Sequence, residues 1–168
     1  MSAKKSLQAA TAAGLALLGS IAGAGTAAAN DPFTLELPAG VACDFPVRID
    51  GAGGNSIVRT FTSDGGGAVR VLTTGTGSAL TFTNLDSGAT LSLRSSGAVQ
   101  RTTTLADGSS STVTGGHNVL ILFPTDVPAG PSSVLYTGQY VVTVDPSGVY
   151  TLRTTRGTSR NLCAELSD

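Results

Sequence analysis

The chain offers one histidine, His117, for acid–base or nucleophilic chemistry, and it follows two glycines at the start of an apolar run. A serine hydrolase could use this imidazole as its general base, and serines are plentiful. The sequence nevertheless contains no G-x-S-x-G motif, and it lacks the strand, sharp turn and helix that this motif requires. We therefore expect His117 to be a surface or edge residue without a catalytic role.

Two carboxylates placed on either side of a sugar could hydrolyse a glycosidic bond. Most Asp residues stand in turn-like sequences near Gly or Pro, where the side chain caps its own backbone; these are Asp50, Asp64, Asp86, Asp107, Asp126 and Asp145. Glu36 and Asp44 lie near predicted strands and away from such turns. The sequence has no D-x-D-x-D-G calcium loop. Nothing singles out a site, so we predict no catalytic residue, no metal and no cofactor.

Two cysteines, Cys43 and Cys163, are the only thiols in the chain. A zinc site would need further Cys or His ligands, and a catalytic thiol would leave the second cysteine unexplained. In an exported protein such a pair indicates one disulfide. We predict that the bond joins Cys43 to Cys163 and places the segment around Cys43 beside residues 162–166.

The arginines are the remaining charged side chains of interest, because many of them fall in or just after predicted strands: Arg59, Arg70, Arg94, Arg101, Arg153, Arg156 and Arg160. If several share one face of a sheet, they could bind an acidic glycan, since guanidinium groups pair bidentately with carboxylates. The alternative is that they solubilise a face rich in Thr and Ser and protect edge strands. Trp is absent and aromatic residues make up 5%, which argues against a sugar-stacking carbohydrate module.

The charge balance and the N-terminal segment indicate where the protein resides. Charged residues are 12% of the chain and the net charge is −1, which argues against nucleic-acid binding and against a polybasic membrane-surface protein. Lys4 and Lys5 precede an apolar stretch that closes on Ala27-Ala28-Ala29. This order is typical of a secretory signal peptide. We predict cleavage after Ala29, a signal peptide over residues 1–29, a secreted domain over 30–168, and no stable membrane association after cleavage.

The rest of the chain shows the two-residue periodicity of β-strands. The clearest run is 134–145, which predicts one buried face and one wet face, and similar runs cover 79–84, 89–94 and 149–155. Residues 117–123 are continuously apolar, which predicts a central strand that is covered on both faces. Between the runs, Asp-Gly at 64–65 and 107–108, Asp-Ser-Gly at 86–88 and Asp-Pro-Ser-Gly at 145–148 predict hairpin turns.

These patterns predict an all-β fold: an antiparallel β-sandwich or flattened β-barrel of roughly nine to eleven short strands in a meander. The segments 43–47 (CDFPV), 81–88 (TFTNLDSG), 136–138 (YTG) and 161–166 (NLCAEL) resemble uncharacterised small secreted actinobacterial β-proteins. That the predicted secreted domain contains Arg but no Lys fits such a high-GC source. The resemblance implies an exported β-domain with one disulfide, and it supplies no activity and no site residues.

We therefore predict a secreted, non-catalytic protein that binds an extracellular ligand or surface. One alternative is a barrel that carries a small apolar ligand, which an enclosed apolar cavity would favour. The other is a hydrolase with an unrecognised acidic site, which two facing carboxylates in a cleft, or His117 beside a serine, would favour.

Overall fold

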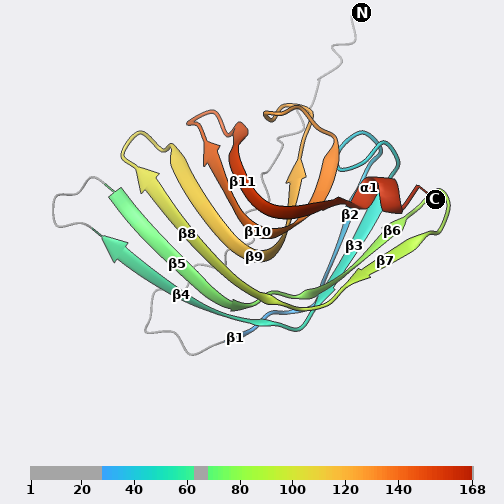
Figure 1. Cartoon of the computed structure of the whole chain (residues 1–168), viewed down its shortest axis with the longest axis horizontal. Helices are drawn as coiled ribbons and strands as arrows, with labels where there is room; N and C mark the ends of the chain where they lie inside the picture. Colours follow the sequence, from blue (N-terminus) through green and yellow to red (C-terminus); the bar gives the residue numbers. More distant parts are fainter. Residues whose placement is uncertain (1–27, 63–67, 168) are drawn as a thin grey trace, which may run out of the picture.

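The computed structural model describes residues 28–62 and 68–167, and they form two antiparallel β-sheets (Figure 1). The smaller sheet has the order β2-β3-β6-β7, with β2 (Phe33–Leu37), β3 (Val47–Ala52), β6 (Ala79–Asn84) and β7 (Thr90–Leu93). The larger sheet has the order β1-β4-β5-β8-β9-β10-β11, with β1 (Ala28–Ala29), β4 (Asn55–Thr62), β5 (Ala68–Thr76), β8 (Gly97–Leu105), β9 (Ser110–Leu122), β10 (Ser132–Val144) and β11 (Tyr150–Asn161). One short helix, α1 (Leu162–Glu165), follows β11.

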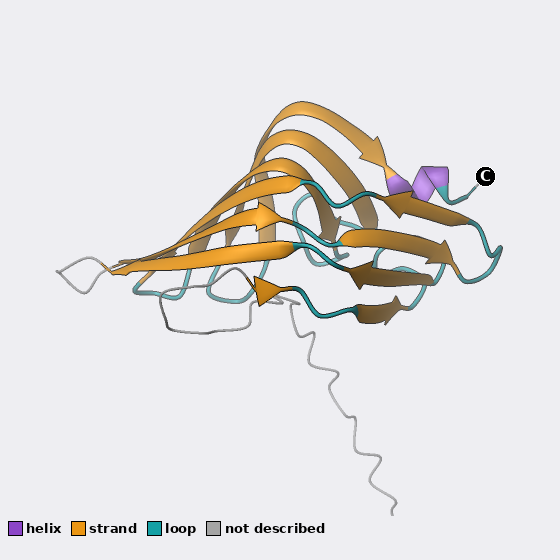
Figure 2. Ribbon diagram, turned by 90° about the horizontal axis from the view of Figure 1, so that it is seen from below, coloured by secondary structure: helices purple, strands orange, loops and turns teal. Residues whose placement is uncertain are grey.

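The sequence correctly predicts the all-β sandwich, and the barrel alternative is wrong because neither sheet of the described residues closes on itself. The simple meander holds only for β8 to β11. Before them the chain alternates between the sheets: β2-β3 and β6-β7 are hairpins of the small sheet, and the hairpin β4-β5 belongs to the large one. Three short passages, at residues 53–54, 77–78 and 94–96, carry the chain across (Figure 2).

A row of small residues crosses the large sheet level with these passages. Four glycines and one alanine are register partners on five neighbouring strands, in the order Gly75, Ala98, Gly116, Gly138, Gly157. All four glycines have positive φ, and a Cβ at Gly116 or Gly138 would overlap a carbonyl oxygen of the neighbouring strand. We call this row the crease, because β9, β10 and β11 bend at it (Figure 1). It divides the large sheet into two arms.

The main core lies between the small sheet and one arm of the large sheet. Its buried residues are Cys43, Val47, Ile49, Phe82, Leu162 and Leu166, and half-buried Val119, Ile121 and Leu135 pack against them. The last three come from β9 and β10 beyond the crease, on the side that faces the small sheet. This arm therefore forms the sandwich, whereas the arm with β4, β5 and β8 extends past the small sheet (Figure 1).

The predicted disulfide is present: Cys43 and Cys163 are bonded, with their Cα atoms 5.5 Å apart. Neighbouring hydrogen bonds tie the same two chain ends into the core. The buried Asn84 side chain donates to the Leu166 carbonyl at 3.0 Å, and the buried Ser133 hydroxyl donates to the Ala42 carbonyl at 3.1 Å. The segment around Cys43 thus lies beside residues 162–166, as predicted.

The strand predicted at 134–145 corresponds to β10, but the face predicted to be solvent-exposed is exposed over only part of its length. Tyr140 and Val142 are buried as predicted. On the opposite side, Ser133 and Leu135 are also covered, because beyond the crease that side packs on the small sheet. The strand at 117–123 corresponds to the second half of β9, and its predicted central position is wrong. Among the described residues, the pairing of β9 with β8 ends at Gly116, so residues 117–122 pair only with β10. Its two faces are nevertheless covered, with Ile121 in the main core and Leu122 buried on the other side.

Turn predictions are confirmed at 86–88, 107–108 and 145–148, where each glycine has positive φ. Asp107 and Asp145 each accept a backbone N–H two residues on, at 2.9 Å. Hydrogen bonds from Ser109 and Ser147 respectively hold the pKa of each carboxyl below its ordinary value. Asp50 does not cap a turn: it lies within β3. The predicted turn at 64–65 and the predicted signal peptide up to residue 27 lie outside the described residues.

Asp126 has a larger role than a local turn cap. It is buried within the segment 123–131 that joins β9 to β10. One carboxylate oxygen accepts the Phe123 N–H at 2.7 Å, and the other accepts the Tyr150 N–H at 3.1 Å. Val127 of the same segment exchanges backbone hydrogen bonds with Tyr150 and Leu152 of β11. The segment therefore links the two arms of the bent sheet.

Candidate functional site

Six arginines belong to strands of the large sheet, and all six are exposed: Arg59, Arg70, Arg101, Arg153, Arg156 and Arg160. Strand register places them on one face, which we call the arginine face. Arg59 and Arg101 are both partners of Leu72, from either side of β5. Arg70 faces the same way from β5, diagonal to each of them. The three guanidinium groups therefore surround one point of the sheet.

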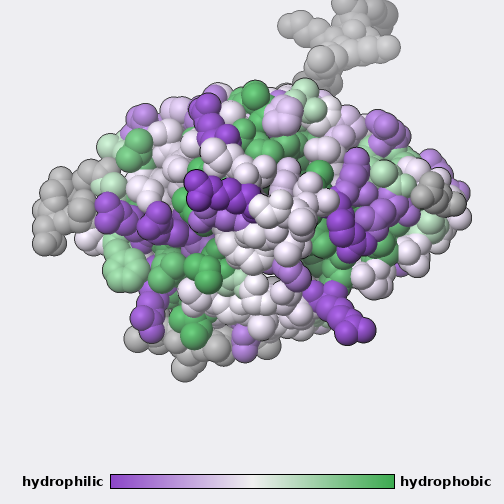
Figure 3. Space-filling view, viewed as in Figure 1, coloured by the Kyte–Doolittle hydropathy of each residue, from purple (hydrophilic) through white to green (hydrophobic). Residues whose placement is uncertain are grey.

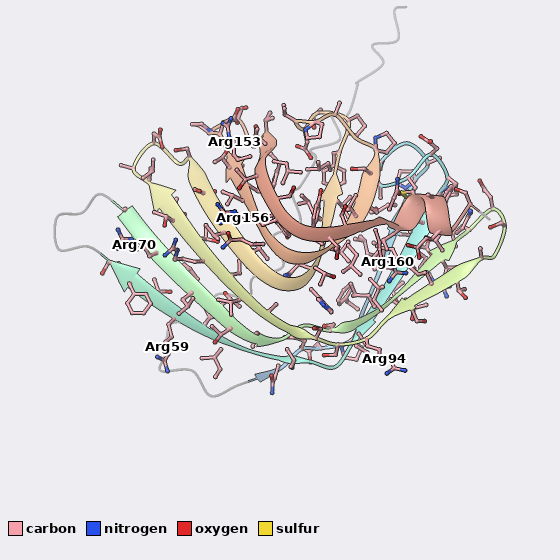
Figure 4. The ribbon with its side chains drawn as sticks, viewed as in Figure 1. Arg59, Arg70, Arg94, Arg153, Arg156 and Arg160 are labelled. Atoms are coloured by element: carbon pink, nitrogen blue, oxygen red, sulfur yellow. A yellow bond between two sulfur atoms is a disulfide. The ribbon has the colours of Figure 1, made fainter. Side chains whose placement is uncertain are left out.

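The last three of these arginines follow from the register of β11. Arg156 pairs with Gln139 and Arg160 with Leu135, both on the arginine side of β10. Arg153 is the extra residue where the register shifts, and its Nε donates to the hydroxyl of Thr143 at 2.9 Å. Since Thr143 is also on the arginine side, the bulge turns Arg153 to the same face. Figure 4 shows Arg59 and Arg70 over one end of the sheet and Arg153 and Arg156 over β11.

The charged residues in the strands of the large sheet are all positive, in contrast to the net charge of the whole chain. No Asp or Glu occurs in any strand of this sheet, although the net charge of the protein is negative. Carboxylates lie at the hairpin tips instead, at Asp107 and Asp145. Within the described part of the chain, the only ion pair made by an arginine of this face is that of Arg160 with Glu165. The face is therefore a positive surface on an acidic protein.

Exposed apolar side chains lie among these arginines. Phe61, Val99 and Leu105 are each about half exposed and have the same orientation as the arginines on β4 and β8. Phe61 is the direct register partner of Arg70. Figure 3 shows hydrophobic and strongly hydrophilic side chains side by side over the arm that carries β4, β5 and β8. A ligand on this face would meet both guanidinium groups and apolar contacts.

A cleft of about 490 Å³ opens where the chain passes between the sheets. We call it the fork cleft, because β6 and β7 diverge there from β9, β10 and β11. Its apolar lining consists of Leu80, Leu93, Val119 and Leu135. Its polar lining consists of Ser78, Ser92, Arg94, Ser95, Ser96, His117, Thr137 and Arg160. A second, shallower hollow lies at the small sheet, beside Phe33, Asp50 and Thr81.

The polar groups of the fork cleft differ in how they are held. Arg160 donates to both carboxylate oxygens of Glu165, from Nε at 3.0 Å and from a terminal nitrogen. These hydrogen bonds hold the pKa of Glu165 below its ordinary value and raise the pKa of Arg160. His117 is exposed and makes no side-chain hydrogen bond among the described residues. The loop 94–96 is anchored by the Ser95 hydroxyl on the Gly77 carbonyl and by the Gly77 N–H on the Ser96 carbonyl at 3.0 Å.

These arrangements bear on the enzyme alternative. Serine hydroxyls share the cleft with His117, but no hydrogen bond joins a serine to the imidazole among the described residues. Counting the described residues, neither hollow is lined by two carboxylates: the fork cleft has none and the second hollow has Asp50. Glu36 is exposed on β2 opposite Arg48, and Asp44 is exposed next to Cys43, so neither lines a cleft. In the described ranges, no three metal-ligating side chains of His, Cys, Asp or Glu gather at one point.

The opposite face of the large sheet is partly enclosed, and no arginine of the described strands lies on it. Tyr140 and its register partner Thr114 are both buried there. Burial raises the pKa of Tyr140, and the nearby Thr114 hydroxyl opposes part of that effect. Among the described residues the Thr114 hydroxyl has no hydrogen-bond partner of acceptable geometry. The side chains of this face therefore fill the inside of the bend.

The sequence listed all these arginines, but it did not show that those of the large sheet share a face or that His117 borders a cleft. Comparison with family models, with curated proteins and with solved structures finds no match to this chain. Across the described residues, no helix is long and apolar enough to cross a membrane.

Proposed function

We propose that this protein is a secreted, non-catalytic binding protein whose arginine face binds a carboxylate-bearing glycan. The observation that carries the proposal is that six exposed arginines lie on one face of a sheet whose strands contain no carboxylate. Guanidinium groups recognise carboxylates bidentately, which gives both geometry and energy. The rest of the protein is acidic, so an anionic ligand is directed to this face.

The spacing of the arginines favours a polymer over a small anion. Arg59 and Arg101 are two strands apart, which corresponds to roughly 10 Å, and Arg156 lies three strands beyond Arg101. One exposed ion pair contributes only about 0.2–1 kcal/mol. A chain with repeated carboxylates can engage several such groups at once, and its affinity then exceeds that of any single contact.

The decisive test compares two forms of one polysaccharide. We expect immobilised polygalacturonate to retain the protein, and its fully methyl-esterified form to retain none. Arg101→Ala should lower the affinity at least about twofold, and the triple variant with Arg59→Ala and Arg70→Ala at least about tenfold. Arg48→Ala is the matched control: it removes the same charge from β3, where Arg48 pairs with Asp50 at 2.9 Å. Its affinity should be unchanged.

Salt and competitors separate a specific face from general charge attraction. Raising the salt from about 0.05 M to about 0.2 M should weaken binding, and the triple variant should show a shallower salt dependence. Equal losses for Arg48→Ala and Arg101→Ala would show that only net charge matters. If double-stranded DNA bound more tightly than the polysaccharide at the same salt, the proposed ligand class would be wrong.

Export is the other half of the proposal, and the disulfide supports it because such bonds persist in oxidising compartments. Intact-mass analysis of culture supernatant should find a chain that begins at Asn30. Cleavage there removes β1, which covers only Asn55 and Ser56 at the edge of β4, so the folded domain should remain intact. A full-length species confined to the membrane fraction would contradict this proposal.

A further inference from the structure

We propose that the fork cleft is a second, independent binding site for a small amphipathic carboxylate, such as a medium-chain fatty acid. The proposal does not depend on glycan binding, because the cleft has its own apolar walls and its own arginine, Arg94, which is not part of the arginine face; only Arg160 belongs to both. It is built by β6, β7 and the loop 94–96 on one side, and by β9, β10 and β11 on the other.

The apolar lining of the cleft favours a ligand with an alkyl chain. Leu80, Leu93, Val119 and Leu135 are half-buried and also pack against the main core, so the lining is held in place. All four are aliphatic, and among the described residues no Phe, Tyr or Trp lines the cleft. A sugar ring would find no stacking partner here, whereas an alkyl chain buries its surface well against such side chains.

The rim of the cleft determines the head group. Arg94 comes from the loop between β7 and β8 and Arg160 from β11, and both line the cleft. Figure 4 shows the Arg94 side chain projecting outward below β7. Glu165 already neutralises Arg160, so Arg94 carries the uncompensated charge and His117 offers an N–H donor. The Arg94 side chain extends outward (Figure 4), and the two residues that follow it, Ser95 and Ser96, are hydrogen-bonded to Gly77. The flexible side chain of Arg94 can fold over a carboxylate that enters the cleft.

The size and openness of the cleft set limits on the ligand. A volume of about 490 Å³ is within the range of small-molecule sites in proteins. The cleft opens to solvent beside exposed His117 and exposed Arg94, so the charged end of a ligand can remain hydrated. This geometry favours a single alkyl chain with an anionic end over a fully apolar molecule.

The test is a calorimetric titration of the secreted domain with hexanoate, octanoate and decanoate below their critical micelle concentrations. Affinity should rise about fourfold for each added CH₂ until the cleft is filled. Decanol, which has the same chain without the charge, should bind at least about fivefold more weakly than decanoate. Equal binding of decanol and decanoate would overturn the assignment of Arg94 and His117 to the head group.

Variants locate the site and distinguish this proposal from the glycan proposal. Arg94→Ala should weaken decanoate binding at least about threefold, whereas Arg59→Ala on the far arm should leave it unchanged. Glu165→Gln should strengthen it, because Arg160 then loses its neutralising partner. As a check that does not depend on folding, NMR shifts induced by decanoate in the unmutated domain should centre on residues 93–96 and 117–119. No binding at millimolar decanoate, or shifts centred elsewhere, would exclude the site.

Discussion

The rings of Tyr136 and Tyr140 lie 5.2 Å apart, although both residues belong to β10 and three residues separate them. In an extended strand, residues four positions apart are separated by roughly 13 Å. Gly138 stands midway between them at the crease, with φ of 134°. The two tyrosines are therefore on the inside of the bend, and the arginine face is on its outside.

We predict that Gly138→Ala destabilises the domain by at least about 2 kcal/mol. A Cβ at this position would overlap the Arg156 carbonyl oxygen of β11, and the backbone conformation disfavours any side chain. Gly97→Ala is the control, because a Cβ there meets nothing within 4 Å. Urea unfolding should place the control within about 0.5 kcal/mol of the parent. Equal stability of the two variants would mean that the crease is dispensable.

Some of this architecture could be read from the sequence, and the crease could not. Gly138 preserves the alternation of β10, so the pattern on either side of it looks like one straight strand with a dry and a wet face. The bend changes what covers Leu135 without changing which way it points. The hairpin turns depend on local residue types, and they were predictable for that reason.

The functional surfaces depend on pairings between distant parts of the chain. The shared face of Arg70 and Arg101 requires the pairing of β5 with β8, which a complete hairpin of the other sheet separates in sequence. The fork cleft combines residues from five strands and from the two loops 77–78 and 94–96. The disulfide was predictable, because only two cysteines were available to form it.

We predict that the double variant Cys43→Ser/Cys163→Ser is less stable than the parent by about 2–5 kcal/mol. The bond closes a loop with a sequence separation of 120 residues and so restricts most of the unfolded chain. Denaturant unfolding of the variant and of the reduced parent should give similar midpoints, both below that of the oxidised parent. An unchanged midpoint would show that the hydrogen bonds of Asn84 and Ser133 already hold the two ends together.

We predict that Asp126→Ala destabilises the domain by about 1–3 kcal/mol, because two backbone N–H groups lose their acceptor. Asp126→Asn keeps one carbonyl oxygen and should fall between that variant and the parent. Asp86→Ala, in an exposed turn, should change the stability by less than about 0.5 kcal/mol. Amide exchange at Tyr150 should accelerate in the Ala variant. Unaltered protection at Tyr150 would contradict the role of Asp126 as a link between the arms.

Alkaline pH should destabilise the domain through Tyr140. Burial raises its pKa in the folded state, whereas an unfolded tyrosine titrates near about 10. Its contribution to stability is therefore complete below about pH 10 and is lost as the pH rises through the folded-state pKa. Unfolding measurements at several pH values should show a shallower loss in Tyr140→Phe. Parallel curves for the variant and the parent would assign the alkaline effect to other groups.

The crease also determines where this protein can tolerate changes in length. Each of its glycines is the register partner of a small residue on the neighbouring strand, so the crease fixes how residues are paired on both sides of it. Insertions at the hairpin tips leave the register of every strand unchanged. A single residue inserted between Arg156 and Gly157 would shift the first part of β11 by one position against β10. The side chains before the insertion would then turn to the other face of the sheet. Guanidinium groups would then point toward buried Tyr140 and half-buried Tyr136, so length variation among related sequences should be confined to the turns.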